Sequence, residues 1–383
     1  MKKTILIFNG YYIPAKNYGG PTTSIVNLVK ACSNFCDFRL VVLNHDFADT
    51  RIYSDIKPGW NKIGEAQVLY VDDKDFTVMN IVGWISECKA DLMYLGGVFS
   101  IRNLHYLKAA NKANIPVIVP PRGELCTNAL KVKAYKKVPF LFFLRLFRVY
   151  SKVYFHATSL QEEIGIRKYL DIDKKNIYLI PNIPKTVLRK EKQHKVINEI
   201  KVVSISRICR TKNVLTAIKV INLINYNAVF HIYGPIEDIE YWRECENEIK
   251  KSPANVSIKY CGELPVENVC ETFTNYDCFL FPTITENYGH SIVESMLSGC
   301  PVIISRGTTP WDDVNENGGF TGELANIDTF VNVVNKVAEM DNNTYKALVD
   351  MCIVYINKKV DFENIKNQYI SMFYTIGDTK KSQ

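Results

Sequence analysis

The stretch that decides the fold is FPTITENYGHSIVESMLSGCPVI, residues 281–303. The apolar run 278–281 leads into it and is typical of a short buried strand. A polar loop follows, and Gly289 opens a helical pattern that runs to Leu297 and stops at Gly299. A buried strand followed by a loop and a helix is the repeating unit of parallel sheets that are covered by helices.

Two glutamates lie eight positions apart in this stretch, Glu286 in the loop and Glu294 inside the helix. The free N–H groups at the amino end of a helix favour a phosphate. Beside such a phosphate, Glu286 can reach sugar hydroxyls, and Glu294 can accept hydrogen bonds from the two adjacent hydroxyls of a ribose. The alternative is a solvated helix face with two unrelated glutamates. The apolar and small residues around them favour the binding interpretation.

The same rhythm of strands and helices continues outward from this stretch in both directions. Expected strands are 4–8, 38–43, 67–71, 92–95, 116–119, 153–156, 177–180, 201–206, 229–233, 256–260, 278–281 and 302–305. The segment PNIPKTVLRKEKQHKVINE breaks the rhythm and reads as a linker. We therefore expect an α/β protein with a first domain over residues 1–190 and a second over 191–360. A C-terminal helix over 361–383 is expected to cross back to the first domain.

Composition and charge narrow the class of protein. Of 383 residues, 47% are hydrophobic and 23% charged, which excludes disordered, collagen-like and coiled-coil proteins. The formal net charge is +7, and the excess of Lys and Arg lies in the first half of the chain. A basic first half favours an anionic partner, namely nucleic acid, phosphates or a membrane surface. The eleven cysteines are odd in number and lack Cys-x-x-Cys spacing, as expected of reduced thiols in the cytoplasm.

Two further motifs lie where expected strands end. Arg207 and Lys212 follow the strand 201–206, a position at which two cations suit a diphosphate, with ordinary surface charge as the alternative. Gly19 and Gly20 lie between the first strand and a helix, where glycine lets the backbone approach a ligand. A plain turn and helix cap is the alternative there. The Gly-x-Gly-x-x-Gly and Walker A motifs are absent.

These segments resemble the retaining nucleotide-sugar glycosyltransferases of family 4, which have the GT-B fold of two Rossmann-like parallel-sheet domains facing across a cleft. The resemblance covers nearly the whole chain. Besides the Glu-x7-Glu element with its Arg and Lys, it rests on NGYYIPAKNYGGP (9–21), PPRGEL (120–125), FHATS (155–159), IYGP (232–235), YCGELP (260–265) and TTPW (308–311).

The resemblance implies a role for each matched position. Arg207 and Lys212 would neutralise the diphosphate, Glu286 would contact the donor sugar, and Glu294 would bind the ribose. The remaining donor-binding positions would be Gly19, Gly20, Gly234, Gly262, Asn287, Tyr288, Gly289 and His290.

The acceptor side would involve Arg122, Glu124 and His156. Arg122 stands where many relatives carry a histidine near the reacting carbon, and arginine cannot act as a base, so its catalytic role would be electrostatic. His156 is a second polar group for that position, with a core histidine as the alternative. The chain also departs from the family at Ser206, where glycine is usual, and at Asn287 and Tyr288, which replace a small residue and Phe.

The resemblance implies no metal and no cofactor other than the donor substrate. The pairs Asp73/Asp75 and Asp171/Asp173 have the Asp-x-Asp spacing of metal-dependent glycosyltransferases. That spacing is frequent by chance, and acids before a helix suit its dipole.

The stretch KVKAYKKVPFLFFLRLFRVYSKV, residues 131–153, surrounds an apolar run with basic residues and contains no acidic residue. This pattern fits an interfacial helix on anionic lipid, and it also fits a buried helix that has basic ends. We expect a mixture of the two, a helix that is part core and part membrane-proximal rim. Nucleic acid is not expected, because the aromatic residues follow an apolar face and form no stacking platform.

The resulting hypothesis is a cytoplasmic glycosyltransferase, peripheral at the inner face of the cell membrane. It would move a hexose or N-acetylhexosamine from a UDP-sugar to a polyprenyl-diphosphate-linked or growing saccharide of an O-antigen, capsule or exopolysaccharide. A nucleotide-sugar epimerase of the same fold and a non-catalytic transferase-like subunit are the alternatives.

Overall fold

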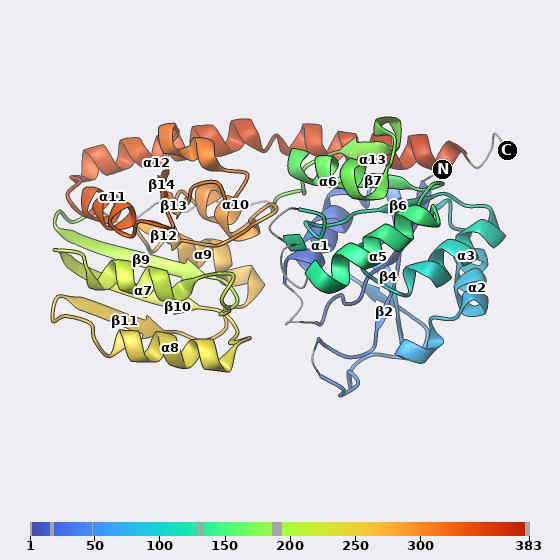
Figure 1. Cartoon of the computed structure of the whole chain (residues 1–383), viewed down its shortest axis with the longest axis horizontal. Coiled ribbons are helices and arrows are strands. Elements are labelled where there is room, and N and C mark those ends of the chain that lie inside the picture. Colours follow the sequence, from blue (N-terminus) through green and yellow to red (C-terminus); the bar gives the residue numbers. More distant parts are fainter. Residues whose placement is uncertain are drawn as a thin grey trace. The chain divides into compact units, whose positions relative to one another are not determined.

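The computed structural model describes residues 2–15, 19–47, 49–126, 129–130, 134–185 and 194–379. The chain forms two compact units (Figure 1). The first takes the chain up to Ile183 and again from Phe362, and the second runs from Pro184 to Asp361. The sequence placed these boundaries at residues 190 and 361, the first of which lies outside the described residues.

The first unit is built on an eight-stranded sheet in the order β3-β4-β2-β1-β5-β6-β7-β8. Its strands are β1 (Lys3–Phe8), β2 (Cys36–Leu43), β3 (Trp60–Ile63), β4 (Ala66–Val71), β5 (Leu92–Leu95), β6 (Val117–Val119), β7 (Tyr154–Ala157) and β8 (Ile177–Leu179). Every pairing is parallel except β3 with β4. The sequence did not predict β3, because this edge strand is half-exposed and has no apolar run.

The helices of the first unit are α1 (Gly20–Cys32), α2 (Val78–Cys88), α3 (Asn103–Ala113), α5 (Ala134–Leu146), α6 (Leu160–Leu170) and α13 (Phe362–Asp378), with short 3-10 turns at Asp73–Asp75 and Lys174–Asn176. The last helix, α13, packs against α1, β1 and β5. Its Phe373 contacts the rings of Phe38 and Tyr94, and its Asp378 accepts a 2.7 Å hydrogen bond from Lys3. The C-terminal helix is therefore part of the first unit's core.

The second unit has a six-stranded, fully parallel sheet in the order β11-β10-β9-β12-β13-β14. Its strands are β9 (Glu199–Ile205), β10 (Asn227–Tyr233), β11 (Val256–Tyr260), β12 (Cys278–Phe281), β13 (Val302–Ser305) and β14 (Phe320–Gly322). Its helices are α7 (Val214–Asn222), α8 (Ile239–Ile249), α9 (Val269–Phe273), α10 (His290–Leu297), α11 (Asp328–Ala338) and α12 (Asn342–Lys359), with 3-10 turns at Val266–Asn268 and Asp312–Glu316.

Parallel pairing brings the carboxyl ends of the strands to one edge of each sheet, so the loops that follow them gather there. In the second unit, β12 and β13 are buried along their whole length, as their apolar sequences require. Helix α10 begins at His290 and ends at Leu297, as the deciding stretch predicted. The loop between β12 and α10 therefore lies at this carboxyl edge.

Candidate functional site

The centre of the candidate site in the second unit is an ion pair between Lys212 and Glu286. The Lys212 Nζ donates a hydrogen bond to the Glu286 Oε1, and the two side chains are only 16% and 14% exposed. The ammonium also lies 5.7 Å from the centroid of the Phe281 ring. The structure thus brings together two residues that are 74 positions apart and that the sequence singled out separately.

Backbone hydrogen bonds tie the loops that carry this pair. The Ile284 amide donates to the Thr211 carbonyl at 2.9 Å, and the Asn213 side-chain amide donates to the Pro282 carbonyl at 2.9 Å. These contacts join the loop after β9 to the loop after β12. The position of Lys212 against Glu286 is therefore set by the backbone as well as by their charges.

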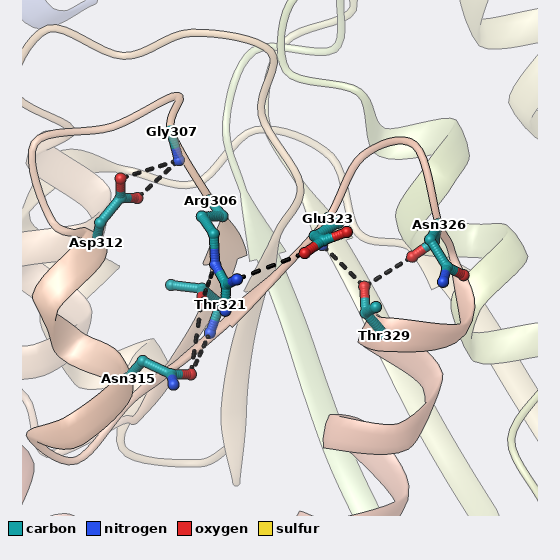
Figure 2. A network of polar contacts seen from close by, with 8 residues as sticks. All are labelled: Arg306, Gly307, Asp312, Asn315, Thr321, Glu323, Asn326 and Thr329. Atoms are coloured by element: carbon teal, nitrogen blue, oxygen red, sulfur yellow. Dashed lines mark hydrogen bonds and ion pairs between the residues drawn. The ribbon is translucent and has the colours of Figure 1, made fainter.

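The loop after β13 supports Glu286 from a third direction. The Glu286 amide donates to the Thr308 carbonyl at 2.8 Å. Figure 2 shows the polar network that fixes this loop. The Gly307 amide donates to both carboxylate oxygens of Asp312, at 2.9 and 3.0 Å. The Arg306 guanidinium contacts Glu323 and the Thr321 hydroxyl. The sequence did not predict this network, because it joins side chains from separate segments and follows no local spacing.

Arg207 lies at the same carboxyl edge but has a different partner from Lys212. Its guanidinium forms an ion pair with Glu237 in the segment between β10 and α8, and both side chains are 43% exposed. Arg210, in the same loop, pairs with Glu244 at 2.6 Å. Because exposed pairs of this kind are weak, an incoming anion can draw Arg207 away at little cost.

Gly234 holds a backbone position that no other residue fits. Its φ is +135°, and a Cβ atom built there would lie 1.9 Å from the Ser206 carbonyl oxygen. The Gly234 amide donates to the Gly262 carbonyl at 2.9 Å, and the Tyr260 hydroxyl donates to the Gly234 carbonyl at 2.9 Å. Gly262 has a φ of +79° but faces open space. Tyr260 was not predicted as a site residue, although its hydroxyl fixes the Gly234 turn.

At the amino end of α10, Gly289 is the N-cap, with a φ of +75°. Tyr288 before it is buried, and its ring packs against His290 and Trp311 at centroid distances of 4.9 and 5.9 Å. The Trp311 indole donates to the Tyr288 carbonyl. The Tyr288 hydroxyl is buried without a hydrogen-bond partner, and burial raises its pKa. Asn287 lies in the same loop, next to Glu286.

Glu294 lies inside α10 and is 8% exposed. Burial raises the pKa of its carboxyl group to about 7, and the charge of Lys185 opposes this only in part. A buried carboxylate whose charge is not compensated gains when hydroxyl donors approach it. Glu294 is therefore suited to accept hydrogen bonds from a ligand.

In the first unit, Arg122 stands at the carboxyl edge of the sheet in a strained backbone conformation, with a φ of +52°. Its Nη1 donates to the Pro21 carbonyl at 2.9 Å, and its Nε is buried without a partner. Pro21 belongs to the first turn of α1, next to Gly19, which is the N-cap, and Gly20, which is the first helical residue. The structure thus connects Arg122 to the two glycines that the sequence singled out at the start of this helix.

Two glutamates, Glu124 half-buried and Glu162 fully buried, hold the loops around Arg122. Glu124 accepts hydrogen bonds from the Val98 and Phe99 amides, and burial raises its pKa to about 7 against these hydrogen bonds. Glu162 is fully buried and accepts from the Gly123 amide as well as from the backbone and hydroxyl of Thr158.

Glu162 was not predicted as a site residue. A signal existed, because Ser159 and Glu162 have the spacing of a helix capping box. The Ser159 hydroxyl does accept from the Glu162 amide at the start of α6. The carboxylate of Glu162, however, turns away to the loop that carries Arg122.

His156 is a core residue, which was the alternative that the sequence left open. It is 1% exposed, its Nε2 donates to the Ile180 carbonyl at 2.8 Å, and its Nδ1 therefore accepts from the Tyr94 hydroxyl at 2.7 Å. Burial lowers its pKa to about 4, so the ring is neutral at physiological pH. Both ring nitrogens are used within the first unit.

The two Asp-x-Asp pairs serve local structure. Asp75 accepts from the Asp72 amide at 3.1 Å in a capping box, and Asp173 accepts from the Lys175 amide at 3.2 Å. Among the described residues, no group of three or more His, Cys, Asp or Glu side chains is placed to hold a metal ion.

A cavity of about 590 Å³ opens in the first unit at the amino ends of β6 and β7, where Pro116 and Val153 line it. None of the predicted site residues lines it. It lies at the sheet edge opposite to Arg122 and is separate from the candidate site. In the part of the chain that is described, no helix is long and apolar enough to span a membrane.

Comparisons with known proteins agree with this architecture. Residues 188–350, which include most of the second unit, match the protein family described as Glycosyl transferases group 1. No curated protein sequence matches the chain.

Solved structures match nearly the whole chain at low identity. HepE of Anabaena, solved with UDP and glucose, is 15% identical with a TM-score of 0.73 over 97% of this chain and all of its own. Sucrose-phosphate synthase of Thermosynechococcus elongatus is 13% identical with a TM-score of 0.74 over 98% and 99%. The lipopolysaccharide outer core galactosyltransferase WaaB is 18% identical with a TM-score of 0.59 over 97% and 99%. The chain thus consists of the two α/β units of the GT-B glycosyltransferase fold.

Proposed function

We propose that the protein is a retaining, metal-independent glycosyltransferase that uses a UDP-sugar. The observation that carries the proposal is the Lys212–Glu286 pair at the carboxyl edge of the second sheet, beside the amino end of α10 and the buried Glu294. The Lys212 ammonium matches the diphosphate of such a donor, the Glu286 carboxylate matches the sugar hydroxyls, and the Glu294 carboxyl matches the ribose diol. HepE, of similar fold, was solved with UDP and with UDP-glucose.

The chemistry follows from where charge develops. The bond between the sugar C1 and the diphosphate oxygen breaks, and its electron pair goes to the diphosphate. The acceptor hydroxyl attacks C1 from the same face, and its proton passes to the departing phosphate oxygen. Lys212, Arg207 and the N–H groups at the start of α10 stabilise the growing negative charge, while Glu286 holds the sugar hydroxyls.

The transferred group is a hexose or N-acetylhexosamine, and the acceptor is a lipid-linked or growing surface saccharide. WaaB, a lipopolysaccharide galactosyltransferase, and TarM, solved with α-GlcNAc-glycerol, support this class of acceptor. Arg122 supplies positive charge on the acceptor side. The protein would act in the cytoplasm at the inner face of the membrane, in keeping with the basic first half of its sequence.

The test is a thermal-shift titration with UDP, GDP, ADP and CMP, in EDTA and in magnesium. A ligand at 100 times its Kd stabilises the folded state by about 2.7 kcal/mol, which is readily measured. We expect UDP to stabilise the wild type in EDTA and to have no effect on Lys212→Ala. Lys219→Ala, an exposed lysine of α7, is the matched control and should respond as the wild type does. A shift that requires magnesium contradicts the metal-independent mechanism.

Incubation with UDP-sugars then separates the alternatives. Release of UDP that depends on an added saccharide, with an α-linked product from an α-linked donor, supports the proposal. An epimerised UDP-sugar without acceptor identifies an epimerase. Failure to bind any of the four nucleotides indicates a non-catalytic subunit.

A further inference from the structure

Helix α5 has a wide apolar face that is exposed among the residues that the structure describes. Five large apolar side chains of the helix, and Phe147 directly after it, are 51–72% exposed. The five are Tyr135, Val138, Phe142, Phe143 and Leu146. Spacings of three and four residues put most of them on one side of the helix. The rings of Phe143 and Phe147 stack at a centroid distance of 6.3 Å. In Figure 1, α5 crosses in front of the first unit's sheet.

The opposite side of α5 anchors it to the first unit. Leu141 and Leu144 are buried in the core of that unit, and the Phe140 ring lies 5.9 Å from that of Phe99. Lys137 lies 5.5 Å from the centroid of the Phe99 ring and donates to the Ala129 carbonyl at 2.7 Å. The helix is therefore firmly packed on one apolar face while it presents a second one to solvent.

Positive charge borders the exposed face. Lys136 and Arg145 flank it on the helix, and Arg148 and Lys152 follow in exposed positions. Arg145 also pairs with Asp171 at 3.5 Å. Lys131 and Lys133, which the sequence added to this cluster, lie outside the described residues. The sequence has no acidic residue between positions 131 and 153.

The combination of an exposed apolar face with bordering charges of one sign favours a lipid surface over a protein as the partner of α5. Surfaces that bind proteins are also enriched in aromatic residues and Arg, but they are depleted in Lys, which borders this face. An apolar face rich in Phe between rows of Lys and Arg alone complements the acyl chains and the phosphates of anionic lipids. The sequence predicted a helix that is part core and part membrane-proximal rim, and α5 has one buried and one exposed apolar face.

We propose that α5 docks the protein on an anionic lipid bilayer. Phe142, Phe143 and Phe147 enter the acyl boundary, while Lys136 and Arg148 contact the lipid phosphates. This inference names the surface behind the membrane location in the proposed function, and it rests on that function only for its biological purpose. The binding itself needs neither donor nor acceptor.

The test is co-sedimentation of the full-length protein with vesicles of phosphatidylcholine containing 30% phosphatidylglycerol, and with vesicles of phosphatidylcholine alone. We expect at least tenfold stronger binding to the anionic vesicles, weakened by salt. The double variant Phe142→Ser/Phe147→Ser should lose at least tenfold, and Lys136→Glu/Arg148→Glu should lose the preference for anionic lipid. Because all four side chains are exposed, the variants are expected to fold.

The matched control is Met351→Ser/Val354→Ser, two apolar side chains on α12 of the second unit that are 50% and 68% exposed. It should bind vesicles as the wild type does. Equal binding by the Phe142/Phe147 variant and the wild type overturns the proposal. A second outcome also overturns it: the wild type does not bind vesicles and is a dimer, and the Phe142/Phe147 variant is a monomer. A second copy of the chain would then cover the apolar face of α5. A UDP thermal shift on every variant separates this outcome from failure of the glycosyltransferase proposal.

Discussion

The carboxyl edges of the two sheets hold their buried charges by different means. In the second unit, Glu286 is paired with the side chain of Lys212, and Glu294 is buried without full compensation of its charge. In the first unit, Glu124 and Glu162 are bound by backbone amides of neighbouring loops. A side-chain ion pair can exchange partners when a charged ligand arrives, whereas a carboxylate bound to backbone amides fixes the shape of a loop.

This difference suggests a division of labour. The second unit has charges that can be redirected to a donor, and the first unit has charges committed to holding Arg122 and its loop in place. The strained φ of Arg122 agrees with this, because such conformations persist only where the surroundings enforce them. The following predictions test the division, beginning with the largest expected effect.

Removing the redirectable charges should abolish transfer without unfolding the protein. We expect Lys212→Ala, Glu286→Ala and Arg207→Ala each to lower kcat by at least about 100-fold, the size typical for loss of one group that stabilises developing charge. The assay is release of UDP in the presence of a saccharide acceptor, with circular dichroism to verify folding. Arg210→Ala is the matched control, since Arg210 lies in the same loop and is paired with Glu244. Full activity in the three site variants would refute the assignment of the donor site to this edge.

Gly234 and Gly262, at the carboxyl edge of the second sheet, should respond differently to substitution by alanine. Gly234→Ala places a Cβ atom 1.9 Å from the Ser206 carbonyl, so the turn must move, and we expect a loss of about 3 kcal/mol in unfolding free energy together with loss of UDP binding. Gly262→Ala meets no atom within 4 Å and should cost about 1 kcal/mol for its positive φ alone. Urea unfolding and UDP titration of both variants measure this contrast, and equal effects would contradict it.

Local sequence patterns indicate more of the second unit's candidate site than of the first unit's. Glu286, Glu294 and Lys212 follow strand ends at recognisable spacings, and α10 begins and ends where its pattern indicated. A local pattern identifies which residues stand at a strand end, but it does not show which way a side chain turns.

That limit explains what was missed in both units. Glu162 has the spacing of a helix cap but binds the loop of Arg122 instead. Tyr260 and Arg306 act on segments distant in sequence, so no spacing reveals them. A histidine looks the same in the sequence whether it lines a site or fills the core. The two hydrogen bonds of His156, which only the structure shows, place it in the core.

If the first unit's carboxylates hold shape, their loss should affect stability more than donor binding. Glu162→Ala leaves the buried Gly123 and Thr158 amides without acceptors, and we expect a loss of about 2 kcal/mol. UDP binding, which we assign to the second unit, should stay within twofold of the wild type. Glu163→Ala is the control on the same helix, since Glu163 is also buried but pairs with the exposed Lys174, and it should cost less. A Glu162 variant that is stable but no longer binds UDP would contradict the division of labour.

The smallest expected effect concerns the proton on Glu294. Burial raises its pKa to about 7, so the carboxyl group is mostly neutral at pH 6 and mostly ionised at pH 8. Only the ionised form accepts hydrogen bonds from both ribose hydroxyls, so nucleoside affinity should rise with pH by about tenfold between these values, which corresponds to about 1.4 kcal/mol. Uridine is the suitable probe because it has no titrating phosphate. Isothermal titration calorimetry of the wild type should show this rise, whereas Glu294→Gln should bind weakly and equally at both pH values. A wild-type affinity that does not change with pH would mean that Glu294 does not contact the ribose, and the ligand-binding charges assigned to the second unit would then be Lys212, Arg207 and Glu286.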